Sequence, residues 1–263
     1  MKRIEELFKK KQTKVFNIYC MAGFPKLENT VTVLRALQDV GVDIIELGMP
    51  YSDPLADGPV IQHSGTIALQ NGMTIKKLFE QLKGFRKSPS TGGVGETIPI
   101  LLMGYMNPIL QYGFEKFCAH ASAVGIDGLI LPDLPEYEYE AEYGPIIKKY
   151  GLDFVFLVTP ETSDDRVRKL DALSSGFLYA VSSSSTTGKD KNITDAKTYL
   201  QRLKNLKLKN PLVVGFGIKD KQTFQTACEN ADGAVIGTAF IKALENDSDV
   251  ERATKKFVNE IIS

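Results

Sequence analysis

Two carboxylates, Glu46 and Asp57, have the setting in this sequence that best suits acid–base chemistry. Glu46 lies in the apolar run 44–48, which is typical of a buried strand. A carboxylate on the apolar face of a strand is costly unless it has a partner or a function. Asp57 follows in a polar loop stiffened by three prolines. One buried and one loop-held carboxylate form a plausible acid–base pair, although a salt-bridged glutamate and a helix-capping aspartate would also fit.

The elements that would position these carboxylates alternate along the chain between strands and helices. Helical spacing of apolar residues predicts a first helix at 3–11 and a helix after most of the strands. Asn29 or Thr30, Thr74 and Asp220 are expected to cap three of these helices. Strands are predicted at 15–20, 44–48, 98–104, 128–131, 154–158, 177–181, 212–215 and 233–236.

This alternation predicts the fold class. Strands separated by helices form a parallel sheet, and eight such units in 263 residues favour a closed (β/α)8 TIM barrel over an open sheet. No break in composition divides the chain, so we expect one domain over residues 1–263. In this fold the active site lies at the carboxyl ends of the strands. Glu46, Asp57 and Tyr179 all fall at or beyond such ends.

Glycines after the last two predicted strands indicate a phosphate site. Gly215-Phe216-Gly217 follows the seventh strand and Gly237-Thr238 follows the eighth. Glycine lets backbone N–H groups approach an anion closely. Thr238 also precedes a short helix predicted at 239–244, whose amino end can hold a phosphate. Barrels commonly bind phosphate in these two loops, so the expected substrate is a small phosphorylated compound.

Composition excludes several classes of function. There are 32 basic and 32 acidic residues, so the net charge is +0 and a nucleic-acid or anionic-membrane surface is not expected. No run of about 18 apolar residues predicts a membrane span, and the charged start of the chain does not resemble a signal peptide. The three cysteines lack disulfide or zinc spacing. We therefore expect a reduced, cytoplasmic protein without a metal.

The block from Glu46 through Pro59, with Ser52-Asp53-Pro54-Leu55-Ala56-Asp57-Gly58 at its centre, resembles the signature of the tryptophan synthase alpha subunit family. The resemblance extends over nearly the whole chain. It implies cleavage of indole-3-glycerol phosphate into indole and glyceraldehyde 3-phosphate by a retro-aldol reaction. It also implies that no cofactor or metal is needed and that an allosteric partner, the pyridoxal-phosphate beta subunit, completes an alpha2-beta2 heterotetramer.

The resemblance also implies roles for individual residues. The catalytic glutamate falls on Glu46 and the catalytic aspartate on Asp57. Burial among apolar residues should raise the pKa of Glu46 and suit it to serve first as acid and then as base. The remaining positions are implied to bind substrate: Tyr19, Met103 and Tyr179 the indole, Gly188, Gly217, Gly237 and Thr238 the phosphate, and Thr187 to close a loop onto the aspartate.

One departure from the family pattern keeps alternatives open. The loop after the sixth strand carries Ser183 and Ser185 where the family often has arginine and glycine, although Thr187 and Gly188 remain. A stiffer loop could alter closure over the site. A catalytically weak or silent subunit that regulates the beta subunit is therefore a second hypothesis. A third is another phosphate-binding barrel, such as a sugar-phosphate isomerase.

Overall fold

The computed structural model describes residues 2–87, 98–181, 193–215 and 217–262. The strands of the described residues are β1 Val15–Met21, β2 Ile44–Gly48, β3 Ile100–Met103, β4 Gly128–Ile130, β5 Asp153–Phe154, β6 Leu157–Val158, β7 Leu178–Val181, β8 Leu212–Gly215 and β9 Gly233–Ile236. They pair in parallel in the order β5-β4-β3-β2-β1-β9-β8-β7-β6. Their side chains are mostly aliphatic or aromatic and buried, as expected for a sheet covered on both faces.

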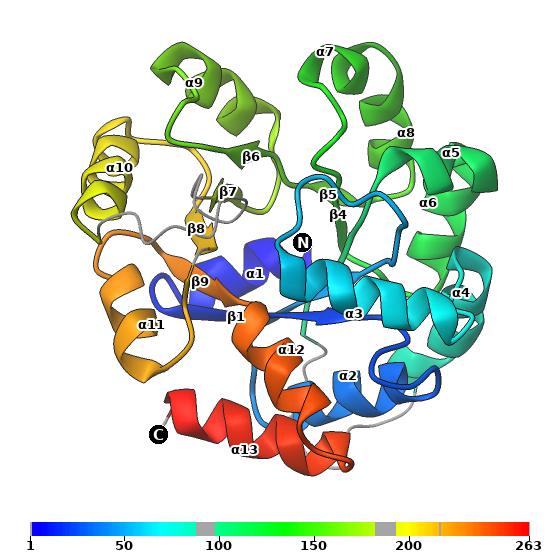
Figure 1. Cartoon of the computed structure of the whole chain (residues 1–263). Helices are drawn as coiled ribbons and strands as arrows, with labels where there is room; N and C mark the ends of the chain where they lie inside the picture. Colours follow the sequence, from blue (N-terminus) through cyan, green and yellow to red (C-terminus); the bar gives the residue numbers. More distant parts are fainter. Residues whose placement is uncertain (1, 88–97, 182–192, 216, 263) are drawn as a thin grey trace.

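Helices surround this ring of strands (Figure 1). They are α1 Arg3–Lys10, α2 Asn29–Asp39, α3 Pro59–Gln70, α4 Ile75–Leu82, α5 Met106–Tyr112, α6 Phe114–Ala123, α7 Glu136–Glu138, α8 Gly144–Lys149, α9 Asp164–Leu173, α10 Ile193–Asn205, α11 Lys221–Ala227, α12 Thr238–Glu245 and α13 Val250–Ile262. A short 3-10 helix, η1 Phe85–Lys87, follows α4, and a π-helical turn, η2 Tyr139–Tyr143, joins α7 to α8.

The barrel closes at the strand predicted over 154–158. That strand is not continuous: β5 pairs with β4, and β6 pairs with β7. Between the two, the Val155 N–H donates to the Leu129 carbonyl (3.0 Å), whereas the Phe156 carbonyl accepts from the Tyr179 N–H (3.0 Å). One stretch of chain thus bonds to both ends of the sheet, so the predicted (β/α)8 barrel is confirmed and only the continuity of this strand was wrong.

Helix α1 covers the amino ends of the strands. Its Arg3 donates to Asp127 just before β4 (2.7 Å), and the preceding Lys2 donates to Asp153 at the start of β5 (2.8 Å). Ile4 is fully buried beside Gly176, ahead of β7. In Figure 1, α1 lies across the middle of the ring of strands. The predicted amino-terminal helix therefore closes the end of the barrel opposite to the carboxyl ends of the strands.

Most predicted caps are confirmed and one is wrong. The Thr74 side chain accepts from the Lys77 N–H (3.1 Å), and Asp220 forms a capping box at the start of α11. At α2, by contrast, Asn29 is already helical, and its side chain accepts from the Lys26 N–H in the preceding turn. Thr30 likewise does not cap α2, because its hydroxyl accepts from the Gly23 N–H (3.0 Å) and ties the β1 loop to the helix.

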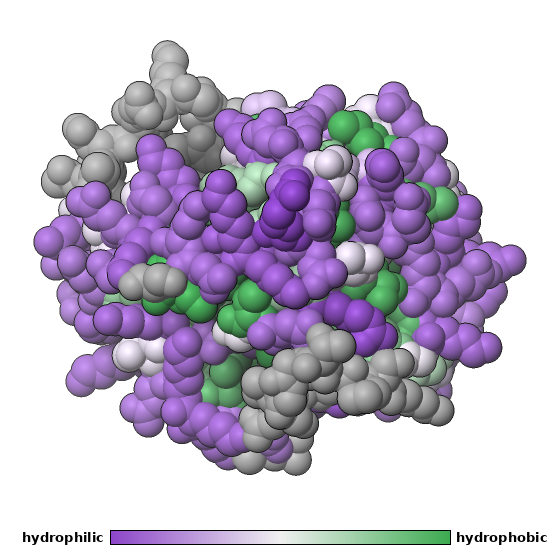
Figure 2. All heavy atoms as spheres, turned by 90° about the horizontal axis from the view of Figure 1, so that it is seen from below, coloured by the Kyte–Doolittle hydropathy of each residue, from purple (hydrophilic) through white to green (hydrophobic). Residues whose placement is uncertain are grey.

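The outer surface is largely polar. Seen from below the view of Figure 1, hydrophilic residues dominate and hydrophobic ones form only scattered patches (Figure 2). The apolar side chains are gathered instead in a core cluster that runs from Ile4 to Ile261. Among the described residues, no helix has the length and apolar character needed to cross a membrane.

Candidate active site

Glu46 is fully buried in the third position of β2. Its neighbour across the sheet is Tyr19 of β1. The carboxyl group extends toward Asn17, which lies two residues before Tyr19 on the same face of β1, and the Asn17 amide donates to Oε1 (2.6 Å). Oε2 has no hydrogen-bond partner of ordinary geometry among the described residues. The strand therefore holds a buried carboxyl group with one oxygen bonded and the other free.

Burial raises the pKa of Glu46 to about 8, and smaller interactions with the Asn17 amide and the Tyr179 hydroxyl oppose this rise. The elevated pKa predicted from the apolar strand is thus confirmed. At neutral pH this group holds its proton, because an isolated charge in so apolar a setting is disfavoured. Glu46 can therefore donate a proton first and accept one afterwards.

Asp57 lies in the loop between β2 and α3. A turn sets its backbone, in which the Asp57 N–H donates to the Pro54 carbonyl (3.1 Å), and Pro59 begins α3 directly afterwards. The Ala56 N–H donates to the Tyr105 hydroxyl (3.1 Å), which fastens the loop to the end of β3. Burial raises the pKa of Asp57 to about 6, in part offset by a hydrogen bond from the Tyr105 hydroxyl. Asp57 is therefore mainly ionised at neutral pH.

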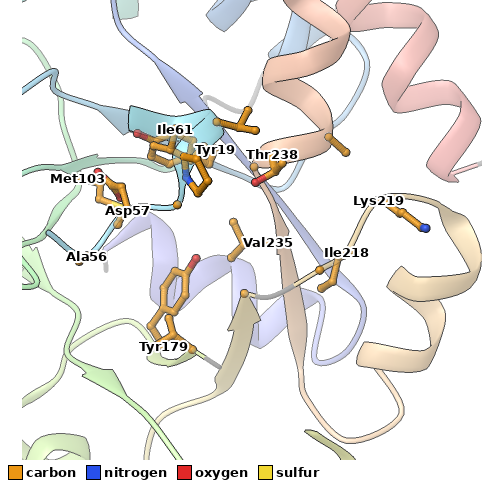
Figure 3. A pocket seen from close by; sticks show the side chains of 18 of the residues that line it. Tyr19, Ala56, Asp57, Ile61, Met103, Tyr179, Ile218, Lys219, Val235 and Thr238 are labelled. Carbon is orange, nitrogen blue, oxygen red and sulfur yellow. The ribbon is translucent and has the colours of Figure 1, made fainter. Parts of the chain in front are cut away.

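A pocket of about 600 Å³ opens at the carboxyl ends of the strands (Figure 3). The predicted site residues in its wall are Tyr19, Asp57, Met103, Tyr179, Gly217, Gly237 and Thr238. Apolar side chains such as Ile61, Leu157 and Val235 supply much of the remaining wall. Glu46 is not a wall residue, because it lies deeper in the barrel, next to Tyr19 and Tyr179.

Two glycines make room for the tyrosines of the pocket. A methyl group on Gly48 would overlap the Tyr19 hydroxyl, and one on Gly215 would overlap the Tyr179 hydroxyl. Burial raises the pKa of both phenols well above the usual range, so both stay neutral. The two rings therefore supply flat apolar walls with fixed hydroxyl groups beside Glu46.

The opposite end of the pocket is suited to an anion. Gly237 caps α12, and Thr238 is the first residue of this eight-residue helix, so unpaired N–H groups border the pocket. Gly217 has φ +57°, a conformation that favours glycine. Lys219 and Lys242 also belong to the pocket lining and were not singled out from the sequence. Only their positions in the sequence could have indicated them: Lys219 follows the glycine loop, and Lys242 lies a helical turn after Thr238.

Other candidates lie away from this pocket. His63 contacts Glu245 (3.2 Å), and His120 contacts Tyr112 (2.7 Å). Asp53 is exposed and accepts from the neighbouring Ser52 hydroxyl (2.5 Å). The predicted loop residues Thr187 and Gly188, the departures Ser183 and Ser185, and Phe216 lie outside the described residues.

Comparison with known proteins decides the family. The sequence profile of the family "Tryptophan synthase alpha chain" matches residues 6–262. The chain belongs to the tryptophan synthase alpha chain family. The tryptophan synthase alpha chain of Bacteroides thetaiotaomicron is 48% identical over 257 residues, 97% of this chain and 98% of that relative. That of Flavobacterium johnsoniae is 51% identical over 249 residues, 94% and 95% of the two chains.

Solved structures agree with this family. The crystal structure of tryptophan synthase subunit alpha from Legionella pneumophila matches with a TM-score of 0.87 and 34% identity, covering 99% of this chain and 97% of that one. As a tryptophan synthase alpha chain, the protein is a lyase of tryptophan biosynthesis that cleaves indole-3-glycerol phosphate to indole and glyceraldehyde 3-phosphate. A sugar-phosphate isomerase is thereby excluded.

Proposed function

We propose that Glu46 is the acid and base of this cleavage. Protonated Glu46 gives its proton to C3 of the indole ring, which turns the ring into a leaving group. The resulting carboxylate then takes the proton of the side-chain hydroxyl adjacent to the bond that breaks. The C–C bond electrons return to the ring, so indole and an aldehyde form and Glu46 regains its proton. One carboxyl group can serve both steps because its pKa of about 8 lies close to working pH.

Asp57 is assigned the stabilisation of charge. Positive charge develops on the indole ring when C3 is protonated, and a carboxylate that accepts a hydrogen bond from the ring N–H stabilises it. Asp57 is held by the Tyr105-bound loop at the pocket wall. With a pKa of about 6 it is ionised where Glu46 is still protonated. The pair therefore offers both required protonation states at once.

The two ends of the pocket suit the two ends of the substrate. Tyr19, Met103 and Tyr179 are assigned to the indole ring, because they give the pocket apolar and aromatic walls and the two tyrosines neighbour Glu46. Gly217, Gly237 and Thr238 are assigned to the phosphate, which would be bound by backbone N–H groups. Thr187 and Gly188 keep their assignments to loop closure and phosphate binding from the family resemblance alone.

The observation that carries this proposal is the neutral, buried Glu46 beside a pocket whose wall holds an ionised Asp57. The test is release of glyceraldehyde 3-phosphate from indole-3-glycerol phosphate by the isolated chain. Glu46→Gln keeps the shape but cannot transfer the proton, so turnover should fall by about 10³-fold or more. Asp53→Asn, an exposed carboxylate of the same loop, is the matched control and should keep its activity.

A wild-type level of cleavage in Glu46→Gln would refute the assignment of Glu46. Absence of cleavage in the wild type itself, with binding to a beta subunit intact, would favour the second hypothesis of a silent regulatory subunit. Ser183 and Ser185 are the only residues that favour this alternative. Restoring arginine and glycine there should then restore turnover.

We propose further that a beta subunit carrying pyridoxal phosphate docks over the pocket to form an alpha2-beta2 heterotetramer. Leu55, 88% exposed on the Asp57 loop, supports a protein partner at this rim. Tyr51, in the same loop, packs in a tilted arrangement against Tyr105 (centroids 5.3 Å apart, planes at 33°). Leu55→Asp should weaken co-elution with a beta subunit and leave the isolated cleavage rate unchanged. Unchanged co-elution would place the interface elsewhere.

The remaining proposals concern cofactors, location and domain organisation. The acid–base route described above uses no cofactor or metal, so we propose that cleavage is unaffected by chelators. We propose a cytoplasmic location, which three free cysteines support. One domain over residues 1–263 is supported by the shared core that joins α1 to α13. A single unfolding transition would be expected for such a domain.

A further inference from the structure

Asn17 is a buried polar residue to which no role has yet been given. It is fully buried in β1, two residues before Tyr19 and on the same face of the strand. Its amide nitrogen donates to Glu46 Oε1 (2.6 Å), and its own oxygen has no hydrogen-bond partner among the described residues. A buried amide with an unsatisfied oxygen costs stability. Packing alone would favour an aliphatic residue at this position, so the amide calls for another explanation.

The bond from Asn17 makes the two oxygens of Glu46 chemically different. Oε1 accepts a hydrogen bond, so it is the carbonyl-like oxygen when the group is protonated, and the acid proton resides on Oε2. Oε2 is buried and forms no hydrogen bond of ordinary geometry among the described residues. A carboxyl oxygen that the protein does not hold by such a bond is the one available to exchange a proton. The Tyr179 hydroxyl, from a residue of the pocket wall, also lies close to the carboxyl group.

We propose that Asn17 is a positioning residue for the reaction: its amide holds Oε1 of Glu46, so that Oε2 is the oxygen that exchanges the proton with the substrate. The inference rests on the proposed role of Glu46. The Asn17–Oε1 bond suits both states of the cycle, because Oε1 accepts in the acid and in the carboxylate alike. The proton leaves from Oε2 to C3 and returns to Oε2 from the hydroxyl, so no atom of Asn17 changes its bonding.

The neighbours of Glu46 do not titrate in the relevant pH range. Tyr19 and Tyr179 have their pKa raised well above normal by burial, and burial raises that of Cys20 to about 12. The charge of Asp57 also raises the pKa of both tyrosines, but Asp57 itself has a pKa of about 6 and is already ionised at pH 8. A loss of activity near pH 8 therefore reports on Glu46.

The test compares two variants of similar shape, Asn17→Leu and Asn17→Asp, in the full chain. Both remove the amide N–H that donates to Oε1. We expect kcat to fall about tenfold or more with a smaller change in KM, because the carboxyl group is no longer oriented. We also expect the alkaline limb of kcat to move upward by about half a pH unit or more, because the amide favours the carboxylate form. Asn17→Asp should shift it further, since two adjacent carboxyl groups resist joint ionisation.

Asn210→Leu is the matched control. Its amide also bonds a carboxylate, that of Asp171 (3.0 Å), but ahead of β8 at the amino end of the barrel. It should lose stability and keep its alkaline limb. Should Asn17→Leu fail to fold, Asn17→Asp retains a polar side chain of the same size. Infrared spectroscopy follows the same titration in the absence of substrate, through the carbonyl stretch of protonated Glu46. This band is assigned by its absence in Glu46→Gln.

An unshifted alkaline limb and an unshifted infrared titration in both Asn17 variants would overturn the positioning role. This result is distinct from failure of the proposed function. If Glu46→Gln remains active, Glu46 is not the acid. If Glu46→Gln is inactive while the Asn17 variants titrate as the wild type does, only the role of Asn17 is wrong.

Discussion

The Tyr179 hydroxyl occupies the space that a side chain on Gly215 would fill. The two residues lie on neighbouring strands, Tyr179 paired with Val213 and Gly215 with Val181. A Cβ at Gly215 would also come within 2.8 Å of the tyrosine ring, closer than packed atoms approach. The position of one wall of the pocket therefore depends on the absence of a side chain on the adjacent strand.

Gly215→Ala should accordingly displace Tyr179 and lower kcat/KM by about 10-fold or more, in line with the cost of overpacking. Tyr179→Phe removes the hydroxyl that collides and should cost less. In the double variant the two changes should be non-additive by about 1 kcal/mol, because they share one contact. Measured kcat/KM values for the four proteins give this coupling. Simple additivity would show that the ring accommodates the methyl group elsewhere.

The two carboxyl groups predict a bell-shaped pH profile of kcat. Activity requires ionised Asp57, so it should rise through a pKa of about 6, and it requires protonated Glu46, so it should fall through about 8. In Asp57→Asn the rising limb should be lost and kcat reduced by about 10²-fold, as for other groups that stabilise developing charge. We choose kcat at saturating substrate because the substrate phosphate ionises near pH 6 as well. A profile flat from pH 7 to 10 would contradict the assignment of Glu46.

Glu46 should lower the free energy of unfolding of the chain as the pH rises. Its pKa is about 8 in the folded chain against an ordinary value of 4.5, so below pH 4.5 both states are protonated and no penalty exists. Between these values unfolding releases a proton, and the penalty grows until it is complete above pH 8. Glu46→Gln should thus be more stable than the wild type at pH 9 by about 5 kcal/mol and little different at pH 4.5. Urea unfolding at both pH values measures this difference.

The assignment of Gly217 to phosphate binding can be tested by substitution. Its φ of +57° would strain an alanine, yet a Cβ there meets no atom within 4 Å. Gly217→Ala should raise KM about five- to tenfold and weaken binding of inorganic phosphate, because about 1 kcal/mol of strain shifts the loop. Gly41→Ala, with φ +80° and equally open space between α2 and β2, is the control. It should lower stability similarly and leave phosphate binding intact.

The barrel could be predicted from the sequence because its strands are apolar runs separated by amphipathic helices. Two helices were missed. α3 begins at Pro59 inside the block read as a loop, although proline at the first helical position is itself a helix signal. α5 contains Asn107-Pro108, which resembles a loop, but Pro108 lies in the first turn, where its missing N–H costs nothing.

Candidate site residues could be predicted where the residue type is unusual for its local sequence. Glu46 was recognisable as a charge in an apolar strand, and Gly217 and Gly237 by their places after strands. Asn17 is likewise a polar residue in the apolar strand 15–21. It was not singled out, because its partner Glu46 lies on another strand and the sequence does not show the pairing. Lys219 and Lys242 had only a positional signal, one after the glycine loop and one a helical turn after Thr238, and that signal does not show which lysines border the pocket.

Helix α1 covers the amino ends of the strands, and the pocket lies at their carboxyl ends. Arg3 and Lys2 fasten that cover to the starts of β4 and β5. With the site that we propose, substrate would enter and both products would leave at the end of the barrel that the Asp57 loop borders. A partner protein docked at that end would receive each indole molecule before it reached bulk water. Because α1 closes the other end of the barrel, such a partner would keep this membrane-permeable product from escaping.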